Sequence, residues 1–410
     1  MYRNQTNDYL TWRKYITSPE MDKFELAYQK VIDYMFKNDF TSYDPYDGLN
    51  TPLNFLKVNE LGRLGMVYFN KFSPLNLRRL FKIEESRQLI TLCTIANAMF
   101  NINNFSKRES VLIDDIYKEL KEKTLYSKYG YHCWDARKFK IQMKNQLIDT
   151  EIPGSVGNEI CGSFLINYYK SRTNKEALDY ISSLADLLLD RFLCERDGMS
   201  FFRYRINDPD NKFTLNASLK ATAFLIKASE VLDNNSYDDT IKKAVNTVLK
   251  LQKNDGSWNY TYWIDKHAEK KQIDFHQGFI LDDILLFMKK YGFEEPYLKS
   301  YEKGLDFYYN KQFLPNGQSI YRHPGKWPVD IHNQAQGIVT FTNASKAGLG
   351  QKYSNFAHTI AGWTIKNMQA KDGHFYFLKY PLFTNKIPYI RWSDSAMAYA
   401  LSVILSKKEN

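Results

Sequence analysis

The sequence predicts an all-α fold, an (α/α)6 barrel of six helical hairpins, and two observations carry this prediction. The first is a repeated turn of the Asp/Asn-Gly type, whose glycines Gly198, Gly256, Gly317 and Gly373 follow one another at steps of 58, 61 and 56 residues. Each turn follows an amphipathic stretch with helical spacing, which is typical of a helix C-terminus. The second is a further helical stretch, rich in small and apolar residues, that begins after each turn at a nearly constant distance. A two-helix unit that recurs in this way indicates a repeat architecture.

The rest of the chain shows the same alternation, so that six pairs of helices are predicted. The amphipathic outer helices are expected at residues 21–36, 110–130, 174–193, 237–253 and 353–369, with one more before Gly317. The apolar inner helices are expected at residues 85–100, 153–171, 216–232, 276–292, 332–348 and 391–405. A closed ring buries every inner face without end caps and places all outer-to-inner connections at one end, which we call the mouth. We expect one domain over residues 1–410, with residues 1–20 as a candidate N-terminal extension; an open α-solenoid is the alternative.

Composition and charge narrow the setting of the protein. Lys and Arg outnumber Asp and Glu by 56 to 46, which favours an anionic partner over a cationic one. Charge alone leaves nucleic acid, an acidic glycan and a membrane surface open. The four cysteines are widely spaced and form no CxxC pair, as is typical of a reducing compartment. No apolar stretch resembles a signal-peptide core or is long enough to cross a bilayer, so we expect a cytoplasmic protein with no transmembrane segment.

One turn and the hairpin count carry a resemblance to known families. The turn at residues 251–258, LQKNDGSW, resembles the Asp-Gly-Trp turn of squalene-cyclase-like proteins. The six-hairpin count is similar to that of six-hairpin glycosidases, polysaccharide lyases and sugar epimerases. The block from about Asp47 to Trp392 resembles squalene-cyclase-like proteins encoded beside glycosyltransferases in bacterial surface-polysaccharide clusters. The resemblance implies a glycan substrate, which can be anionic, a glycosyltransferase as a candidate partner, and no nucleic-acid partner.

The isoprenoid branch of this fold is disfavoured by the residues that it lacks. Zinc-dependent prenyl transfer uses Asp, Cys and His ligands, and Cys93 and Cys161 have no suitably spaced Asp or His. Triterpene cyclases protonate their substrate with an Asp-x-Asp-Asp motif. The three adjacent aspartate pairs of this chain, at residues 114–115, 238–239 and 282–283, all lack the preceding aspartate.

A duplicated Asp-x-His motif supplies the candidate catalytic residues, Asp274, His276, Asp330 and His332. The two aspartates are 56 residues apart, at the same place in consecutive hairpins, so all four side chains are expected around the mouth. A carboxyl pair could hydrolyse a glycosidic bond, whereas a histidine could take a proton α to the carboxyl group of a uronate in elimination or epimerisation. The alternative is structural, because Asp is a favoured helix N-cap.

Further residues of the mouth are candidates for binding the substrate. Arg391 could hold a carboxylate in its fork and Trp392 could stack on a sugar ring, although Arg391 could equally form a structural salt bridge. Trp258 is expected to pin its own turn. Asp47 is explained equally by a turn, and Glu159 by a helix N-terminus. The complete set of candidate binding residues is Arg391, Trp392, Asn216, Tyr46, Asp47, Trp134, Glu159, Trp263 and Trp327.

These residues predict a carbohydrate-active enzyme that processes a cell-surface polysaccharide or its precursor as a hydrolase, lyase or epimerase. No metal site and no cofactor are expected, because no His-x-x-x-His pair or Cys cluster accompanies the Asp-x-His motifs. A glycan- or lipid-binding partner of a glycosyltransferase without catalytic activity is the second hypothesis. An isoprenoid-processing enzyme is the third.

Overall fold

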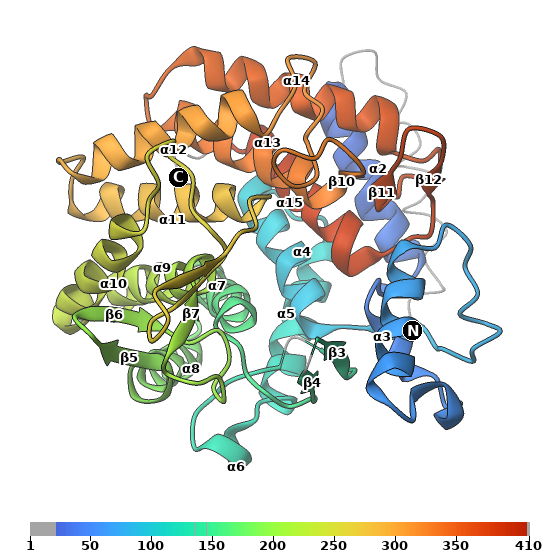
Figure 1. Ribbon diagram of the computed structural model, residues 1–410, viewed down its shortest axis with the longest axis horizontal. Coiled ribbons are helices and arrows are strands. Elements are labelled where there is room, and N and C mark those ends of the chain that lie inside the picture. Colours follow the sequence, from blue (N-terminus) through green and yellow to red (C-terminus); the bar gives the residue numbers. More distant parts are fainter. Residues whose placement is uncertain (1–21, 136, 145, 408–410) are drawn as a thin grey trace.

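Six helical hairpins form a closed barrel in the computed structural model, which describes residues 22–135, 137–144 and 146–407. The candidate extension, residues 1–20, lies outside the described residues. The inner helices are α4 (Leu89–Ile102), α7 (Ser155–Arg172), α9 (Leu215–Leu232), α11 (His276–Tyr291), α13 (Ile331–Lys346) and α15 (Ser395–Leu405). Each inner helix contacts the next, and α15 contacts α4, so that the ring closes (Figure 1). The prediction of an (α/α)6 barrel is confirmed, and the open solenoid is excluded.

The outer helices surround this ring and join the two ends of the chain. They are α2 (Lys23–Lys37), α5 (Lys107–Glu122), α8 (Glu176–Leu187), α10 (Asp238–Lys250), α12 (Tyr297–Lys311) and α14 (Gln351–Met368). Each of the outer helices α5, α8, α10, α12 and α14 packs on the inner helix that precedes it in the chain. Helix α2 has no predecessor and packs on the last inner helix, α15 (Figure 1). The first and last helices therefore stabilise one another.

Local sequence accounts for where several of these helices begin and end. Helix α2 begins after Asp22, whose side chain accepts a hydrogen bond from the amide of Phe24. Helix α5 begins with a capping box, in which Ser106 and Glu109 each bind the other's backbone amide. Inner helices crowd together where a side chain is missing: a Cβ on Gly162 of α7 would lie 2.2 Å from the ring of Phe224 on α9. This is the crowding that the small residues of the inner helices predict.

The mouth connections carry short antiparallel strands that the sequence did not predict. Three two-stranded pairs form within single connections, β1 (Thr41–Ser42) with β2 (Ser86–Arg87), β3 (Ile141–Met143) with β4 (Gln146–Ile148), and β5 (Leu193–Arg196) with β6 (Met199–Phe202). Two three-stranded sheets join successive connections, β7 (Lys212–Thr214), β8 (Thr261–Trp263) and β9 (Ala268–Lys270), and β10 (Val329–Asp330), β11 (Leu378–Lys379) and β12 (Thr384–Asn385). Each of the five sheets is antiparallel throughout.

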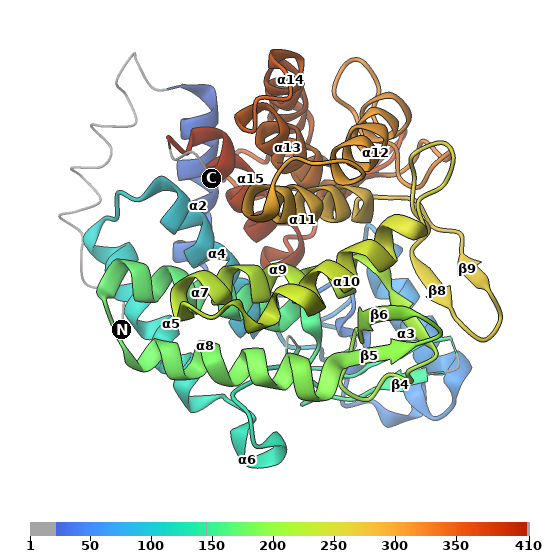
Figure 2. The same cartoon turned by 90° about the vertical axis from the view of Figure 1, so that its left-hand side faces the viewer.

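The connections also carry short helical segments, and the first connection is the longest. It holds η1 (Asp47–Asn50), η2 (Asn54–Lys57) and the helix α3 (Glu60–Phe72). The other segments are α6 (Tyr126–Tyr129), η3 (Leu188–Phe192), η4 (Asn235–Tyr237) and η5 (Ile390–Asp394), the last of which leads into α15. The mouth is the right-hand end of the barrel in Figure 2, where α3 and the labelled strands β4, β5, β6, β8 and β9 lie.

A repeated hydrogen bond explains the regular spacing between the turns and the inner helices. In each of the last three hairpins, an inner-helix side chain accepts the backbone amide of the second residue after the turn glycine. These pairs are Gln277 with Trp258 at 2.9 Å, Gln334 with Ser319 at 2.6 Å, and Asp394 with Phe375 at 2.6 Å. They span 19, 15 and 19 residues of sequence. The expectation that Trp258 pins its turn is confirmed, because its ring is buried and its indole nitrogen donates to the Val248 carbonyl at 3.0 Å.

None of the described helices is both long enough and apolar enough to cross a bilayer.

Candidate functional site

Asp274 and His276 form a hydrogen-bonded pair at the start of α11. Asp274 Oδ1 shares a hydrogen bond of 2.5 Å with His276 Nδ1 and accepts the His276 backbone amide at 3.2 Å. Gln272 Nε2 donates to Asp274 Oδ2 at 2.7 Å. Burial would raise the pKa of the Asp274 carboxyl, but the His276 imidazole and these hydrogen bonds hold that pKa at about 2. The ionised carboxylate orients the imidazole through Nδ1 and leaves Nε2 for proton transfer.

The second motif, in the next hairpin, has a different geometry. Asp330 is the N-cap of α13, and its Oδ1 accepts the backbone amide of His332 at 2.9 Å. Burial raises the pKa of Asp330 to about 6, against the opposing effect of that hydrogen bond. His332 Nδ1 is buried and has no hydrogen-bond partner among the described residues. Asp330 therefore does cap a helix, as the structural alternative holds, and it leaves the His332 ring free.

Both imidazoles lie close to the ring of Phe275. The Phe275 ring centroid is 4.2 Å from that of His276 and 5.2 Å from that of His332, so the two imidazole centroids are no further apart than the sum of these distances. Burial, helped by the neighbouring Arg391 and His276 side chains, lowers the pKa of His332 to about 3. His332 is therefore a neutral imidazole at physiological pH.

Two aromatic side chains from opposite ends of the chain extend the row of rings formed by His276, Phe275 and His332; we call these rings together the aromatic wall. Trp392, on η5, lies 4.2 Å from His332 and 5.4 Å from Tyr46 between ring centroids. The Tyr46 hydroxyl accepts a hydrogen bond of 2.6 Å from Lys71 Nζ of α3. Burial lowers the pKa of Lys71. The site thus combines two imidazoles with a half-buried aromatic surface.

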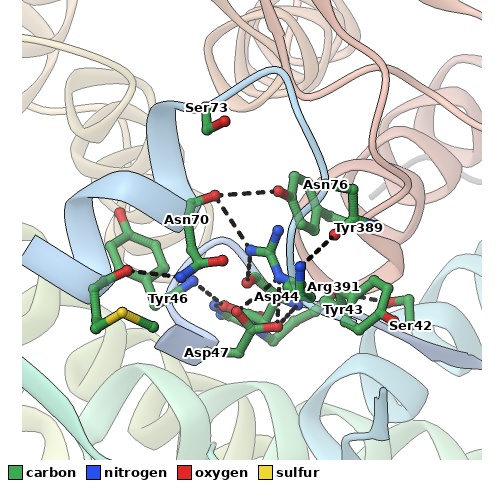
Figure 3. Close-up of polar contacts among 12 residues, drawn as sticks. Ser42, Tyr43, Asp44, Tyr46, Asp47, Asn70, Ser73, Asn76, Tyr389 and Arg391 are labelled. Carbon is green, nitrogen blue, oxygen red and sulfur yellow. Dashed lines mark hydrogen bonds and ion pairs between the residues drawn. The ribbon is translucent and has the colours of Figure 1, made fainter. Parts of the chain in front are cut away.

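Arg391 is held in place by Asp44, a residue of the first mouth connection (Figure 3). Arg391 Nη2 donates to Asp44 Oδ1 at 3.0 Å, and Arg391 Nε donates to Asp44 Oδ2. The same carboxylate accepts the backbone amide of Tyr46 at 2.9 Å. Burial opposes the charge of Arg391, but the Asp44 carboxylate keeps the pKa of Arg391 above its usual value. Arg391 does form the structural salt bridge that the sequence left open, and this pair joins the first connection to the last inner helix.

Asp47 lies beside Asp44 in the same connection (Figure 3), and Arg78 binds its carboxylate. Arg78 Nε is 2.9 Å from both carboxylate oxygens of Asp47, and Asp47 Oδ2 also accepts the amide of Asp44 at 2.9 Å. Arg78 Nη2 donates to the carbonyls of Asp44 and Asn70 at 2.7 and 3.2 Å. Both side chains of the ion pair are buried. Asp47 therefore anchors the loop that presents Asp44 and Tyr46.

Of four other candidate binding residues, Trp134 and Glu159 are buried and bonded within the protein, and Trp263 and Trp327 lie on mouth connections. Trp134 is only 1% exposed, and its indole nitrogen donates to the Leu120 carbonyl at 2.9 Å. Glu159 lies deeper on α7 and binds Lys227 Nζ at 2.8 Å. Trp263 lies on β8, and Trp327 lies on the loop before β10. The expectation that Trp134 offers a ring face to a sugar is corrected by its burial.

Asn216 stands in the first turn of α9, and it is buried with its Oδ1 unpaired among the described residues. An unpaired amide oxygen at the mouth end of an inner helix can accept a hydrogen bond from a hydroxyl group. Asn216 therefore stays a candidate for binding.

Four arginines around the mouth each lie beside a carboxylate of opposite charge. Arg137 lies 3.6 Å from Asp135, Arg205 lies 3.6 Å from Asp208, and Arg322 lies 3.8 Å from Asp274. Arg391 has Asp44 in the same way. Each of these four arginines has a carboxylate within 4 Å, whereas Lys71 donates to the Tyr46 hydroxyl. Among the described residues no group of three or more His, Cys, Asp or Glu side chains could hold a metal ion.

Sequence reasoning missed Asp44, Lys71 and Phe275. Asp44 opens the Asp-Pro-Tyr-Asp-Gly stretch in which Tyr46 and Asp47 were chosen, so the motif itself was visible. Phe275 is the central residue of the first Asp-x-His motif. Lys71 carried no signal, because α3 belongs to no repeat and its approach to Tyr46 arises only from the folded first connection.

Comparisons with known proteins agree on the fold. The sequence matches no protein-family model and no curated protein. The structure is similar to that of D-mannose isomerase, with a TM-score of 0.65 and 15% identity over 95% of this chain and 99% of that chain. It is similar to cellobiose 2-epimerase from Bacillus thermoamylovorans, with a TM-score of 0.63 and 13% identity over 92% and 99% of the two chains. It is also similar to a GH76 α-mannanase from Bacteroides thetaiotaomicron, with a TM-score of 0.62 and 12% identity over 78% and 85%. In its fold the chain is a six-hairpin, glycosidase-like α/α toroid.

Proposed function

We propose that this protein is a sugar epimerase or isomerase that moves a proton at the carbon next to the carbonyl of a reducing sugar. One observation carries the proposal: two imidazoles lie close to the Phe275 ring, one oriented by a carboxylate and the other neutral. Proton transfer α to a carbonyl needs a base beside the carbon and a donor beside the oxygen. Two of the structures that share the fold bear the names of a sugar isomerase and a sugar epimerase.

His276 is the base in this mechanism. The Asp274 carboxylate at Nδ1 stabilises the imidazolium that forms when Nε2 takes the proton from carbon. His332 stays neutral and donates a hydrogen bond to the carbonyl oxygen, where negative charge develops in the enediolate. Trp392 and Tyr46 offer ring faces to the sugar. Return of a proton to the opposite face of the same carbon gives epimerisation, and return to the neighbouring carbonyl carbon gives isomerisation.

The paired charges at the mouth favour a neutral sugar over the anionic glycan that the sequence suggested. Four arginines lie beside carboxylates at this end of the barrel, and an anionic substrate that used one of them would have to displace its partner; Lys71, on the Tyr46 hydroxyl, is outside these pairs. A titration that compares a hexose with the corresponding hexuronate tests this point, and tighter binding of the uronate would contradict it.

Hydrolysis by the two carboxyl groups is the second candidate. The pKa values of Asp274 and Asp330, about 2 and about 6, are displaced in opposite directions, as an acid and a carboxylate base require. Each of these carboxylates, however, is buried and bonded to the backbone of its own motif. The rings of the two histidines are the more accessible groups of the motifs.

The sequence resemblance and the cysteines support a cellular role for this activity. A surface polysaccharide or its precursor as the source of the sugar, and a glycosyltransferase as a partner, are supported by the sequence resemblance. A cytoplasmic location is supported by the four cysteines, which are buried and unpaired. A binding protein without catalytic activity remains the alternative role for the same site, whereas an isoprenoid enzyme has no further support.

Solvent exchange tests the reaction directly. Incubation of mannose, fructose, glucose or cellobiose with the protein in D2O should replace hydrogen by deuterium at the carbon next to the carbonyl, as followed by proton NMR. His276→Gln and His332→Gln should each lower the exchange rate by at least about 10²-fold. His374→Gln is the matched control, because His374 forms an Asp-x-His pair of 2.6 Å with Asp372 in a turn and should keep full activity.

Other outcomes would redirect the assignment. Release of sugar from a glycoside that survives His276→Gln but not Asp274→Asn would establish hydrolysis instead. Calorimetric binding of a glycan with neither exchange nor hydrolysis would establish the binding role.

A further inference from the structure

Helix α3 turns an apolar face to the solvent. Its exposed residues Leu61, Gly65 and Tyr68 recur every three to four residues, as on one side of a helix, and Phe69 is also exposed, whereas Leu64 and Phe72 are only partly exposed. The buried residues of α3 lie on the opposite side. Figure 1 shows α3 at the edge of the molecule, outside the ring of hairpins.

Exposed apolar side chains on both flanks extend this face. Phe55 and Val58 of the preceding segment are 72% and 76% exposed, and Leu61 is 79% exposed. Seven of the fifteen exposed large apolar side chains recorded for the described residues fall between residues 55 and 80. We call this set the α3 patch; its members are Phe55, Val58, Leu61, Tyr68, Phe69, Leu75 and Leu80. Apolar side chains gathered in this way mark an interaction surface.

Basic residues surround the patch. Residues 54–82 contain six Lys or Arg and one acidic residue, Glu60. Arg78 is buried in its ion pair with Asp47 and Lys71 donates to the Tyr46 hydroxyl, so the cations beside the patch are Lys57, Arg63, Arg79 and Lys82. Lys57 Nζ donates to the carbonyls of Leu49 and Thr51, and Arg63 Nε donates to the Gln142 amide oxygen at 2.7 Å. These contacts bring no negative charge, so the positive charge of both side chains remains. Arg79 and Lys82 are exposed on the loop after α3.

A groove at the edge of the patch mixes the same two chemistries. It has a volume of about 430 Å³ and runs between the η2 segment and the β3–β4 hairpin. Its walls include Leu49, Val58 and Leu147 together with the cations Lys57 and Arg63. Apolar walls with cations beside them suit an amphiphile whose head group is negative.

We propose that the α3 patch docks on a lipid bilayer that contains anionic phospholipid. The apolar side chains enter the head-group region, and the surrounding cations lie against the phosphates. A second copy of the chain is a poorer occupant, because a symmetric contact would oppose two surfaces with the same positive charge. The inference does not depend on the reaction at the mouth.

Vesicle flotation tests the proposal with the full chain. The protein should float with vesicles of phosphatidylcholine and phosphatidylglycerol at 70:30 and should remain unbound with phosphatidylcholine alone. Leu61→Gln/Tyr68→Gln and Arg79→Gln/Lys82→Gln should each lower the partition coefficient, the second by roughly fivefold for each charge removed. High salt should weaken the binding of the wild-type protein.

Matched controls separate the patch from general surface effects. Val111→Gln/Tyr126→Gln removes exposed apolar groups elsewhere, and Lys299→Gln/Lys366→Gln removes exposed lysines of α12 and α14; both should bind as the wild type does. Circular dichroism checks that all variants are folded. Failure of the wild type to float with anionic vesicles overturns the proposal, as does equal loss in the controls. A dimer in light scattering that Leu61→Gln/Tyr68→Gln dissolves, without vesicle binding, would assign the patch to a second copy.

Discussion

An ion pair between the Asp44 carboxylate and the Arg391 guanidinium joins the first mouth connection to the segment before the last inner helix. The two residues are 347 residues apart in sequence; the Asp44 side chain is fully buried and that of Arg391 is 19% exposed. Their pairing fixes the first mouth connection against the segment that carries Trp392. The position of the aromatic wall beside His332 therefore depends on this ion pair.

Replacing Asp44 should unfold the protein more easily. Asp44→Asn leaves Arg391 as a buried charge without a carboxylate, and breaking such a pair from one side costs about 3–5 kcal/mol. The free energy of unfolding from urea titration measures the effect. Asp265→Asn is the control, because its 2.7 Å pair with Arg196 is well exposed and should contribute no more than about 1 kcal/mol. Equal losses in the two variants would contradict the importance of the Asp44 pair.

Replacing Asp274 should impair activity far more than stability. Asp274→Asn keeps an oxygen for the backbone amide of His276 but removes the negative charge at Nδ1. The imidazolium that forms during proton abstraction then lacks its counter-charge, and kcat should fall by about 10²–10⁴-fold. The exchange rate in D2O and the melting temperature are measured on the same sample. A large loss of stability with full activity would show that Asp274 is a structural residue only.

Asp394 should make the stability of the protein depend on pH. Burial raises the pKa of Asp394 from 3.8 to about 7, so between these values the folded state binds more protons than the unfolded state. Stability is lost as the pH rises through this window. Asp394→Asn removes the ionisation and should stabilise the protein by on the order of 4 kcal/mol at pH 8 and by little at pH 4.

The equivalent residue in another hairpin provides the reciprocal test. Gln277 accepts the amide of Trp258 as Asp394 accepts the amide of Phe375. Gln277→Glu should therefore introduce a pH-dependent loss of stability that the wild-type hairpin lacks. A difference between Asp394→Asn and the wild type that is the same at pH 4 and pH 8 would contradict this account.

The repeat could be predicted from sequence because each turn is held by local chemistry. The hydrogen bond from Trp258 to Gln277 acts over 19 residues, and such a short-range constraint leaves a regular spacing in the sequence. The same regularity located Asp274 and Asp330 on consecutive hairpins. The partners of Arg391 and Tyr46 could not be predicted, because Asp44 and Lys71 reach them only through the irregular first connection. Burial likewise decides that Trp134 supports the core, and no pattern within its own loop distinguishes it from an exposed tryptophan.

The turn glycine Gly256 should resist substitution because of its neighbour on the next outer helix. Its φ is +94°, and a Cβ would lie 2.3 Å from the Lys303 carbonyl oxygen of α12. Gly130 has a φ of +76° but no atom within 4 Å of such a Cβ. Gly130→Ala should therefore cost only the backbone strain, about 1–2 kcal/mol. Gly256→Ala adds a clash with the backbone and should lower the free energy of unfolding by at least about 2 kcal/mol more. Urea titration of both variants measures the difference. Equal losses would mean that the turn moves away from α12 without cost, and that its contact with the outer helix does not hold the hairpins together.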